Sequence, residues 1–161
     1  MKICVLSDTH IPVAAPELPP VVLQAFAGAD MILHAGDILE LRVLDDLRAL
    51  APVHAVRGNM DRWDTQEALP IQTVVEAGGK RIGLVHGGGP PWGLTGRVLR
   101  QFKDVDIIVF GHSHHALNEQ REKVLLFNPG SPTDRRFAPY RSYGVIEIAD
   151  DTVKAEIVRL A

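Results

Sequence analysis

The feature that most constrains this fold is a repeated local order, in which a short apolar run ends in a polar turn. Five such turns occur along the chain: "SDTH" at 7–10, "HAGD" at 34–37, "GNMD" at 58–61, "HGG" at 86–88 and "GHSH" at 111–114. Short apolar runs bounded by turn residues are typical of buried strands. The chain is therefore expected to form sheets whose strands end in polar turns.

The remaining pattern predicts which elements join these turns. Strands are expected over 2–6, 31–33, 53–56, 71–76, 80–85, 107–110, 124–127, 143–148 and 153–158, and helices over 21–27, 39–50 and 94–102. Leucines at 41, 44, 47 and 50 give the second helix its apolar face. Gly78-Gly79 and Asp150-Asp151 are predicted hairpin turns. Strands that alternate with helices, followed by hairpin strands, predict an α/β fold with two sheets covered by helices.

Composition restricts the class of protein. The chain has 161 residues, of which 46% are hydrophobic and 23% charged, so one domain over 1–161 is expected. A net charge of −3 argues against bulk nucleic-acid binding. No apolar run approaches the ~20 residues of a membrane span, and the apolar run at the amino end is too short for a signal peptide. Because Cys4 is the single cysteine, no internal disulfide can form, and a cytoplasmic location is expected.

The side chains of the five turns form a candidate metal site. Turns at the carboxyl ends of strands in an open α/β sheet line up where ligands bind. Each motif alone also fits ordinary turn or hydrogen-bonding chemistry, but their joint occurrence at strand ends favours a shared site. Their nitrogen and oxygen donors, without thiolates, suit Mn²⁺, Fe, Zn²⁺ or Ni²⁺. The candidate ligands are Asp8, His10, Asp37, Asn59, His86, His112 and His114.

The series Asp-x-His, Gly-Asp, Gly-Asn-x-Asp, His-Gly and Gly-His-x-His resembles the calcineurin-like metallophosphoesterase superfamily. The chain length and the "NPGS" at 128–131 are most similar to its small YfcE-like phosphodiesterases. The resemblance implies a four-layer α/β/β/α sandwich, the metallo-dependent phosphatase fold, with a site for two divalent metal ions. Manganese is the ion expected first, with nickel, zinc or iron as alternatives. A homodimer or homotetramer is also implied.

The resemblance divides the candidate ligands between two ions. Asp8, His10, Asp37 and His114 would hold one ion, and Asp37, Asn59, His86 and His112 the other, with Asp37 bridging. An ion pair of this kind holds a shared hydroxide that attacks phosphorus in a phosphate-ester substrate. Asp37, Asn59, His86 and Asp61 are therefore the expected catalytic residues, and Asp61 is expected to orient a ligand histidine. His115 is expected to start the next strand or lie at the rim.

One position departs from the family pattern. Many superfamily members carry histidine directly after the asparagine of the third motif, where this chain has Met60, and a thioether cannot donate a proton. Either His34 or Asp61 replaces it as the acid, or the leaving groups must be good ones. Arg57, Arg97, Arg135 and Arg136 could contact phosphate or could simply be solvated.

Three functions are consistent with these residues. The first is a phosphodiesterase. The second is a phosphomonoesterase or nucleotide phosphatase on the same site. The third is a non-enzymatic scaffold similar to the metallophosphoesterase-like subunit of retromer, although all seven ligand positions hold residues able to bind metal.

Overall fold

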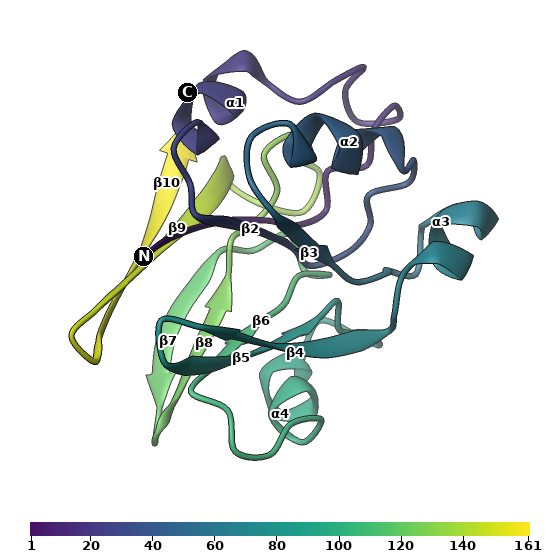
Figure 1. Ribbon diagram of the computed structural model, residues 1–161. Coiled ribbons are helices and arrows are strands. Elements are labelled where there is room, and N and C mark those ends of the chain that lie inside the picture. The colour runs from purple at the N-terminus through teal and green to yellow at the C-terminus, as the bar shows by residue number, and fades with distance from the viewer.

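The fold is built on two five-stranded sheets, in a computed structural model that describes residues 1–161 (Figure 1). The first sheet has the order β10-β9-β1-β2-β3. Its strands are β1 (Lys2–Leu6), β2 (Met31–His34), β3 (Val53–Ala55), β9 (Arg141–Ala149) and β10 (Thr152–Leu160). Strands β1, β2 and β3 are parallel, and β9 and β10 form an antiparallel hairpin at one edge.

The second sheet has the order β4-β5-β6-β8-β7. Its strands are β4 (Gln72–Ala77), β5 (Lys80–Val85), β6 (Ile107–Val109), β7 (Leu117–Arg121) and β8 (Val124–Asn128). Here β5, β6 and β8 are parallel, while β4 and β7 are antiparallel edge strands. Each sheet therefore contains three adjacent parallel strands whose carboxyl ends lie at the same edge.

Four short helices complete the chain: α1 (Pro20–Phe26), α2 (Arg42–Arg48), α3 (Trp63–Ala68) and α4 (Leu94–Leu99). Side chains of α1 and α2 pack on the outer face of the first sheet, and those of α4 on the outer face of the second. The layers are therefore α, β, β and α, which confirms the predicted four-layer sandwich (Figure 1). None of these helices has both the length and the apolar character to cross a membrane.

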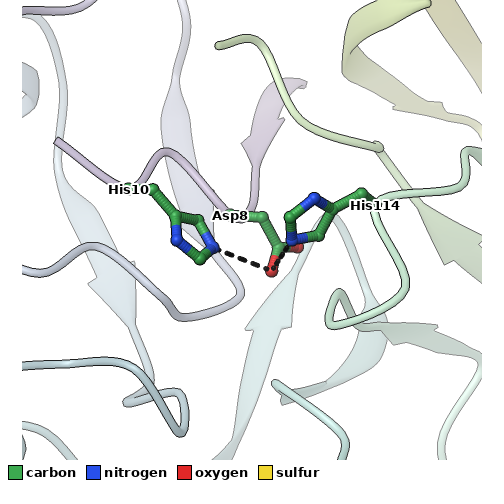
Figure 2. Close-up of side chains that lie close together, drawn as sticks. All are labelled: Asp8, His10 and His114. Atoms are coloured by element: carbon green, nitrogen blue, oxygen red, sulfur yellow. Dashed lines mark ion pairs between the residues drawn. The ribbon is translucent and has the colours of Figure 1, made fainter. Parts of the chain in front are cut away.

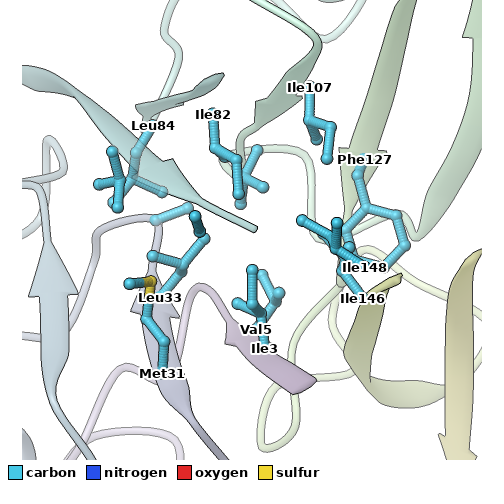
Figure 3. Packing of buried hydrophobic residues seen from close by; sticks show 14 of the residues in the cluster. Ile3, Val5, Met31, Leu33, Ile82, Leu84, Ile107, Phe127, Ile146 and Ile148 are labelled. Atoms are coloured by element: carbon cyan, nitrogen blue, oxygen red, sulfur yellow. The ribbon is translucent and has the colours of Figure 1, made fainter. Parts of the chain in front are cut away.

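The alternation of side chains in β1 shows why its sequence is apolar throughout. Ile3 and Val5 enter the cluster between the two sheets, which Figure 3 shows. Cys4 and Leu6 enter the cluster beneath α1 and α2. Successive residues of a strand face opposite sides, and both sides of this strand are covered. The same holds for β6, where Ile107 and Val109 face the other sheet and Ile108 faces α4.

Several element boundaries differ from the predictions. The second helix covers 42–48 instead of 39–50, because Leu39 has a φ of 77° that no helical residue adopts. Helix α4 ends at Leu99 instead of 102, and α1 begins one residue earlier than predicted. The strands of the last hairpin extend over 141–149 and 152–160. Helix α3 and strand β7 were not predicted at all, because neither carries a clear apolar run.

Candidate metal centre

The five polar turns lie together because they follow parallel strands of both sheets. The first sheet supplies Asp8 and His10 after β1, Asp37 after β2 and Asn59 after β3. The second sheet supplies His86 after β5 and both His112 and His114 after β6. All seven predicted ligand residues are connected by the contacts described below, so the structure brings them to one place between the two sheets.

The carboxylates of Asp8 and Asp37 share one arrangement, in which one oxygen is held and the other faces the histidines. Oδ2 of Asp8 accepts hydrogen bonds from Ser7 Oγ at 2.6 Å and from the backbone N–H of His112 at 3.1 Å. Oδ1 of Asp37 accepts one from the backbone N–H of Met60 at 2.8 Å. The second oxygen of each carboxylate is left to face the centre of the site.

Histidine nitrogens surround these two free oxygens. Nε2 of His114 lies 3.4 Å and Nε2 of His10 3.8 Å from Asp8 Oδ1, as Figure 2 shows. Nε2 of His10 and Nε2 of His86 both lie 3.3 Å from Asp37 Oδ2. Donor atoms bound to one ion at ~2.1 Å are separated from one another by about 3–3.5 Å, and three of these four distances fall in that range.

Two groups of donors meet the requirement for holding a cation. Asp8, His10 and His114 form one group, and Asp8, Asp37 and His86 form the other, with the ligand atoms of each group within 4.8 Å of one another. Asp8 Oδ1 and His10 Nε2 are buried and have no hydrogen-bond partner in the protein. Buried polar atoms without a partner are rare in folded proteins. The donor set and these unpartnered atoms therefore fit divalent metal ions.

Electrostatics keeps both carboxylates ionised. Burial alone would raise the pKa of Asp8, but His86, His10 and His114 outweigh it and hold that pKa well below its ordinary value. Burial likewise opposes ionisation of Asp37, whose pKa is lowered by His10 and His86. Burial would lower the pKa of His10 and of His86, but the two aspartates raise each pKa to about 9. Both carboxylates are therefore ionised, and a cation bound here takes the place of the protons that the two histidines carry without it.

Hydrogen bonds to backbone carbonyls set the orientation of two histidine rings. Nδ1–H of His86 donates to the carbonyl of Ala35 at 2.8 Å, which leaves Nε2 facing Asp37 and Asn59. Nε2–H of His112 donates to the carbonyl of Gly89 at 2.7 Å, which leaves Nδ1 as its free nitrogen. The two rings meet edge to face, with centroids 5.3 Å apart. Fixing one ring nitrogen in this way orients the other for metal binding.

The backbone of the site is left-handed at five of the seven ligand residues. Asp8, His10, Asp37, His112 and His114 have φ between 47° and 73°. Only a few per cent of residues other than glycine adopt positive φ. Each residue held in this region costs ~1–3 kcal/mol of stability, and such residues cluster at functional sites. The conformation turns each of these side chains back toward the site directly after its strand ends.

Asp61 and His34 are both fixed by hydrogen bonds within the protein. Asp61 accepts hydrogen bonds from the backbone N–H groups of Leu39 and Gly58, both at 2.7 Å, and forms no hydrogen bond with a histidine. It therefore holds the turns and does not orient a ligand ring. His34 is fully buried, its Nδ1 accepts the N–H of Gly36 at 3.2 Å, and its Nε2–H donates to Thr9 Oγ1 at 3.1 Å. Neither side chain is free to act as an acid. His115 is exposed and lies two residues before β7, so it does not begin that strand.

Sequence reasoning missed the residues that support the ligands. The "NPGS" turn follows β8, and Asn128 Nδ2 donates to the carbonyl of Gly111 at 3.0 Å. Ser131 Oγ donates to the carbonyl of Asp8 at 2.7 Å. Asp134 Oδ2 lies 3.9 Å from His114 Nδ1 and is bound by Arg136. The position of "NPGS" directly after a parallel strand was the signal that could have indicated this role.

Gly111 provides a test of this packing. A Cβ atom at Gly111 would lie 1.8 Å from Ser7 Oγ and 2.6 Å from Asp8 Oδ2. We expect Gly111→Ala to lower the free energy of unfolding by about 1–3 kcal/mol, because the buried side chains must shift, and to weaken metal binding. Urea denaturation and calorimetric metal titration measure the two effects. Gly88→Ala is the control, since a Cβ atom at Gly88 would have no other atom within 4 Å and the φ of Gly88 is not positive. Equal stability of the two variants would contradict the expectation.

His34 provides a test by pH. Burial lowers the pKa of His34 to about 3, so between pH 3 and 6.5 the unfolded chain binds a proton that the folded chain does not. Stability is therefore lost as pH falls below 6.5, by at most ~1.4 kcal/mol per pH unit. We expect the metal-free His34→Asn variant to be less stable at pH 7.5 but to lose less stability between pH 6.5 and 5. Urea titrations measure this, with exposed His54→Asn as control. Parallel profiles for wild type and His34→Asn would rule the explanation out.

Comparison with known sequences identifies the family. Residues 1–151 match the sequence profile of the calcineurin-like phosphoesterase superfamily domain. The chain belongs to this superfamily. A curated member, a probable metallophosphoesterase of Methanothermobacter thermautotrophicus, is 41% identical over 161 residues, which cover 99% of this chain and 92% of that protein.

Solved structures of the calcineurin-like phosphoesterase fold agree with this assignment. Vps29 of Entamoeba histolytica in complex with Zn²⁺ has a TM-score of 0.78 and 30% identity, and the match covers 99% of each chain. A novel archaeal phosphodiesterase has a TM-score of 0.75 at 21% identity, over 98% of this chain and all of that one, which shows the shared fold.

Proposed function

We propose that the protein is a metal-dependent phosphodiesterase that holds two divalent ions, with Mn²⁺ the first candidate. The observation that carries the proposal is the position of Asp37 Oδ2, which lies 3.3 Å from Nε2 of both His10 and His86. A carboxylate oxygen between two donor groups is suited to bridge two cations. Asp8, His10 and His114 would complete one ion site, and Asn59, His86 and His112 the other.

The chemistry is hydrolysis of a phosphate ester. Ions bound here would lower the pKa of a water molecule and offset charge on the phosphoryl oxygens. The protein contributes orientation, because Asp8 and Asp37 are each fixed through one oxygen and His86 through Nδ1. The exposed Asn59 lies at the entrance, where its amide can also contact a phosphoryl oxygen. Fixed donors of this kind stabilise a transition state without reorganisation.

A hollow beside the site supports a diester substrate. It has a volume of about 380 Å³ and is lined by Asn59 and His86. A phosphodiester carries an alcohol group on each side of phosphorus, and this hollow offers space for one of them.

The proposal is tested by hydrolysis of bis(p-nitrophenyl) phosphate and p-nitrophenyl phosphate after chelation and after Mn²⁺ is restored. Cleavage that returns with Mn²⁺ and is faster for the diester supports it. Faster cleavage of the monoester would instead indicate the phosphomonoesterase or nucleotide phosphatase. Replacing Mn²⁺ by Zn²⁺, Ni²⁺ or Fe²⁺ identifies the preferred metal.

The second candidate is a scaffold similar to the metallophosphoesterase-like subunit of retromer. The observation in its favour is the 30% identity between this chain and a Vps29 that was solved with Zn²⁺. Metal binding without hydrolysis of either ester would favour it. The complete set of ligand residues supports the enzyme, since a scaffold does not require ionised carboxylates and oriented histidines in one place.

A further inference from the structure

We infer that the substrate carries a second phosphate group on its alcohol portion, and that this group binds Arg57 beside the metal centre. The inference rests on the proposed phosphodiesterase function and adds the class of ester that the site selects. It is carried by the hollow that Asn59 and His86 share with three further polar residues, Arg57, Gln66 and Gln101.

The hollow is continuous with the candidate metal centre, because Asn59 and His86 belong to both. Its volume of about 380 Å³ lies within the range of ~300–1,000 Å³ that is typical of small-ligand sites. Ile71 and Val85 are its only hydrophobic lining residues. The space is therefore suited to a small polar group attached to an ester held at the metal centre.

The charge of this hollow is positive and unpaired. None of its lining residues is an aspartate or a glutamate. Arg57 forms no ion pair. Six other arginines each pair with a carboxylate: Arg42, Arg48, Arg62, Arg81, Arg121 and Arg136. An unpaired, half-buried guanidinium next to a ligand site is a natural partner for an anion.

Arg57 is held in place before any ligand arrives. Its backbone N–H donates to the carbonyl of Pro70 at 2.9 Å, and its Nη1 donates to the carbonyl of Gln66 at 3.0 Å. Gln66 is fixed in turn, because its Nε2 donates to the carbonyl of Asp61 at 2.7 Å. Nε and Nη2 of Arg57 donate no hydrogen bond within the protein. Their planar fork matches the oxygens of a phosphate group.

The experiment compares two substrates that differ only in a second phosphate. These are thymidine 5′-(p-nitrophenyl phosphate) and its 3′-phosphorylated form, assayed with the Mn²⁺-loaded protein. We expect kcat/KM of wild type to be about 10-fold higher for the 3′-phosphorylated substrate, mainly through KM, because a charged hydrogen bond is gained. Arg57→Gln should remove this preference, because the guanidinium that would bind the second phosphate is gone.

Two further variants separate charge from structure. Gln101→Glu places a carboxylate in the hollow and leaves the bond from Arg57 to Gln66 intact, so it should reduce the preference without altering the fold. Arg100→Gln removes an exposed arginine directly after α4 that forms no ion pair and does not line the hollow, so it should keep the preference. An Arg100→Gln variant that loses the preference as fully as Arg57→Gln would overturn the inference.

The outcomes distinguish this inference from the proposed function. If wild type cleaves both substrates equally well, the inference is wrong and the phosphodiesterase proposal stands. If wild type cleaves neither, the phosphodiesterase proposal is wrong, and calorimetric titration with thymidine 3′,5′-bisphosphate tests the hollow directly. Weaker binding by Arg57→Gln than by Arg100→Gln would then support the anion site, and equal binding would overturn it.

Discussion

Replacement of Asp37 by asparagine is expected to lower kcat/KM for bis(p-nitrophenyl) phosphate by at least ~10³-fold, because a preorganised charge next to the reacting phosphate is lost. Asp37 Oδ2 is the oxygen that faces both His10 and His86. In the variant the amide nitrogen can occupy the position of this oxygen, and an amide NH₂ group does not bind a cation. Metal content measured after dialysis should fall together with activity.

The fold of the Asp37→Asn variant should persist. The asparagine retains an oxygen that can accept the backbone N–H of Met60, as Asp37 Oδ1 does at 2.8 Å. Circular dichroism should therefore match wild type. Asp45→Asn is the matched control, because its side chain is 73% exposed on α2. Full activity in Asp37→Asn would exclude the bridging role, and equal loss in Asp45→Asn would show that the assay reports something other than the site.

Replacement of Met60 by histidine is expected to raise the rate on esters with poor leaving groups by about 10²-fold, the lower end of general acid catalysis. Met60 is 57% exposed and directly follows Asn59, and its backbone N–H is held by Asp37. An imidazole at this position can therefore protonate a departing alkoxide. Neither of the other candidate acids is available, since His34 is buried and Asp61 accepts two backbone hydrogen bonds.

The measurement is the dependence of kcat/KM on the pKa of the leaving alcohol. Wild type should show a steep decline from p-nitrophenyl to alkyl esters, and Met60→His a shallower one. The p-nitrophenyl rate should change little, because that leaving group needs no proton. Met60→Gln controls for loss of the thioether without adding an acid. The same gain for both kinds of ester would contradict a role in proton donation.

The position of the site was predictable because each ligand follows a strand end. The apolar runs of β1, β5 and β6 identify buried strands, and parallel strands place their carboxyl ends at one edge. The layers followed from the same runs. The sequence therefore predicted a strand correctly wherever both faces of that strand are buried.

Other features depend on contacts between residues far apart in the chain. Asp61 accepts a hydrogen bond from the backbone of Leu39, 22 positions earlier. No local sequence pattern indicates that Asp61 would bind this backbone group and not a ligand histidine. Strand β7 has alternating half-buried and exposed residues at a sheet edge, so its sequence "LNEQR" lacks an apolar run. The second helix begins late because Leu39 turns the chain, although the leucine spacing extends further.

The left-handed backbone of the ligand residues lowers the stability of the fold at the positions that activity requires. Asp8, His10, Asp37, His112 and His114 each hold a left-handed conformation that glycine adopts without a Cβ clash. A sequence selected only for thermal stability would be expected to drift toward glycine at these positions. Stabilising substitutions found by a screen of folding alone should therefore collect at the site and abolish its chemistry, whereas screens that require metal binding should find their gains elsewhere in the sandwich.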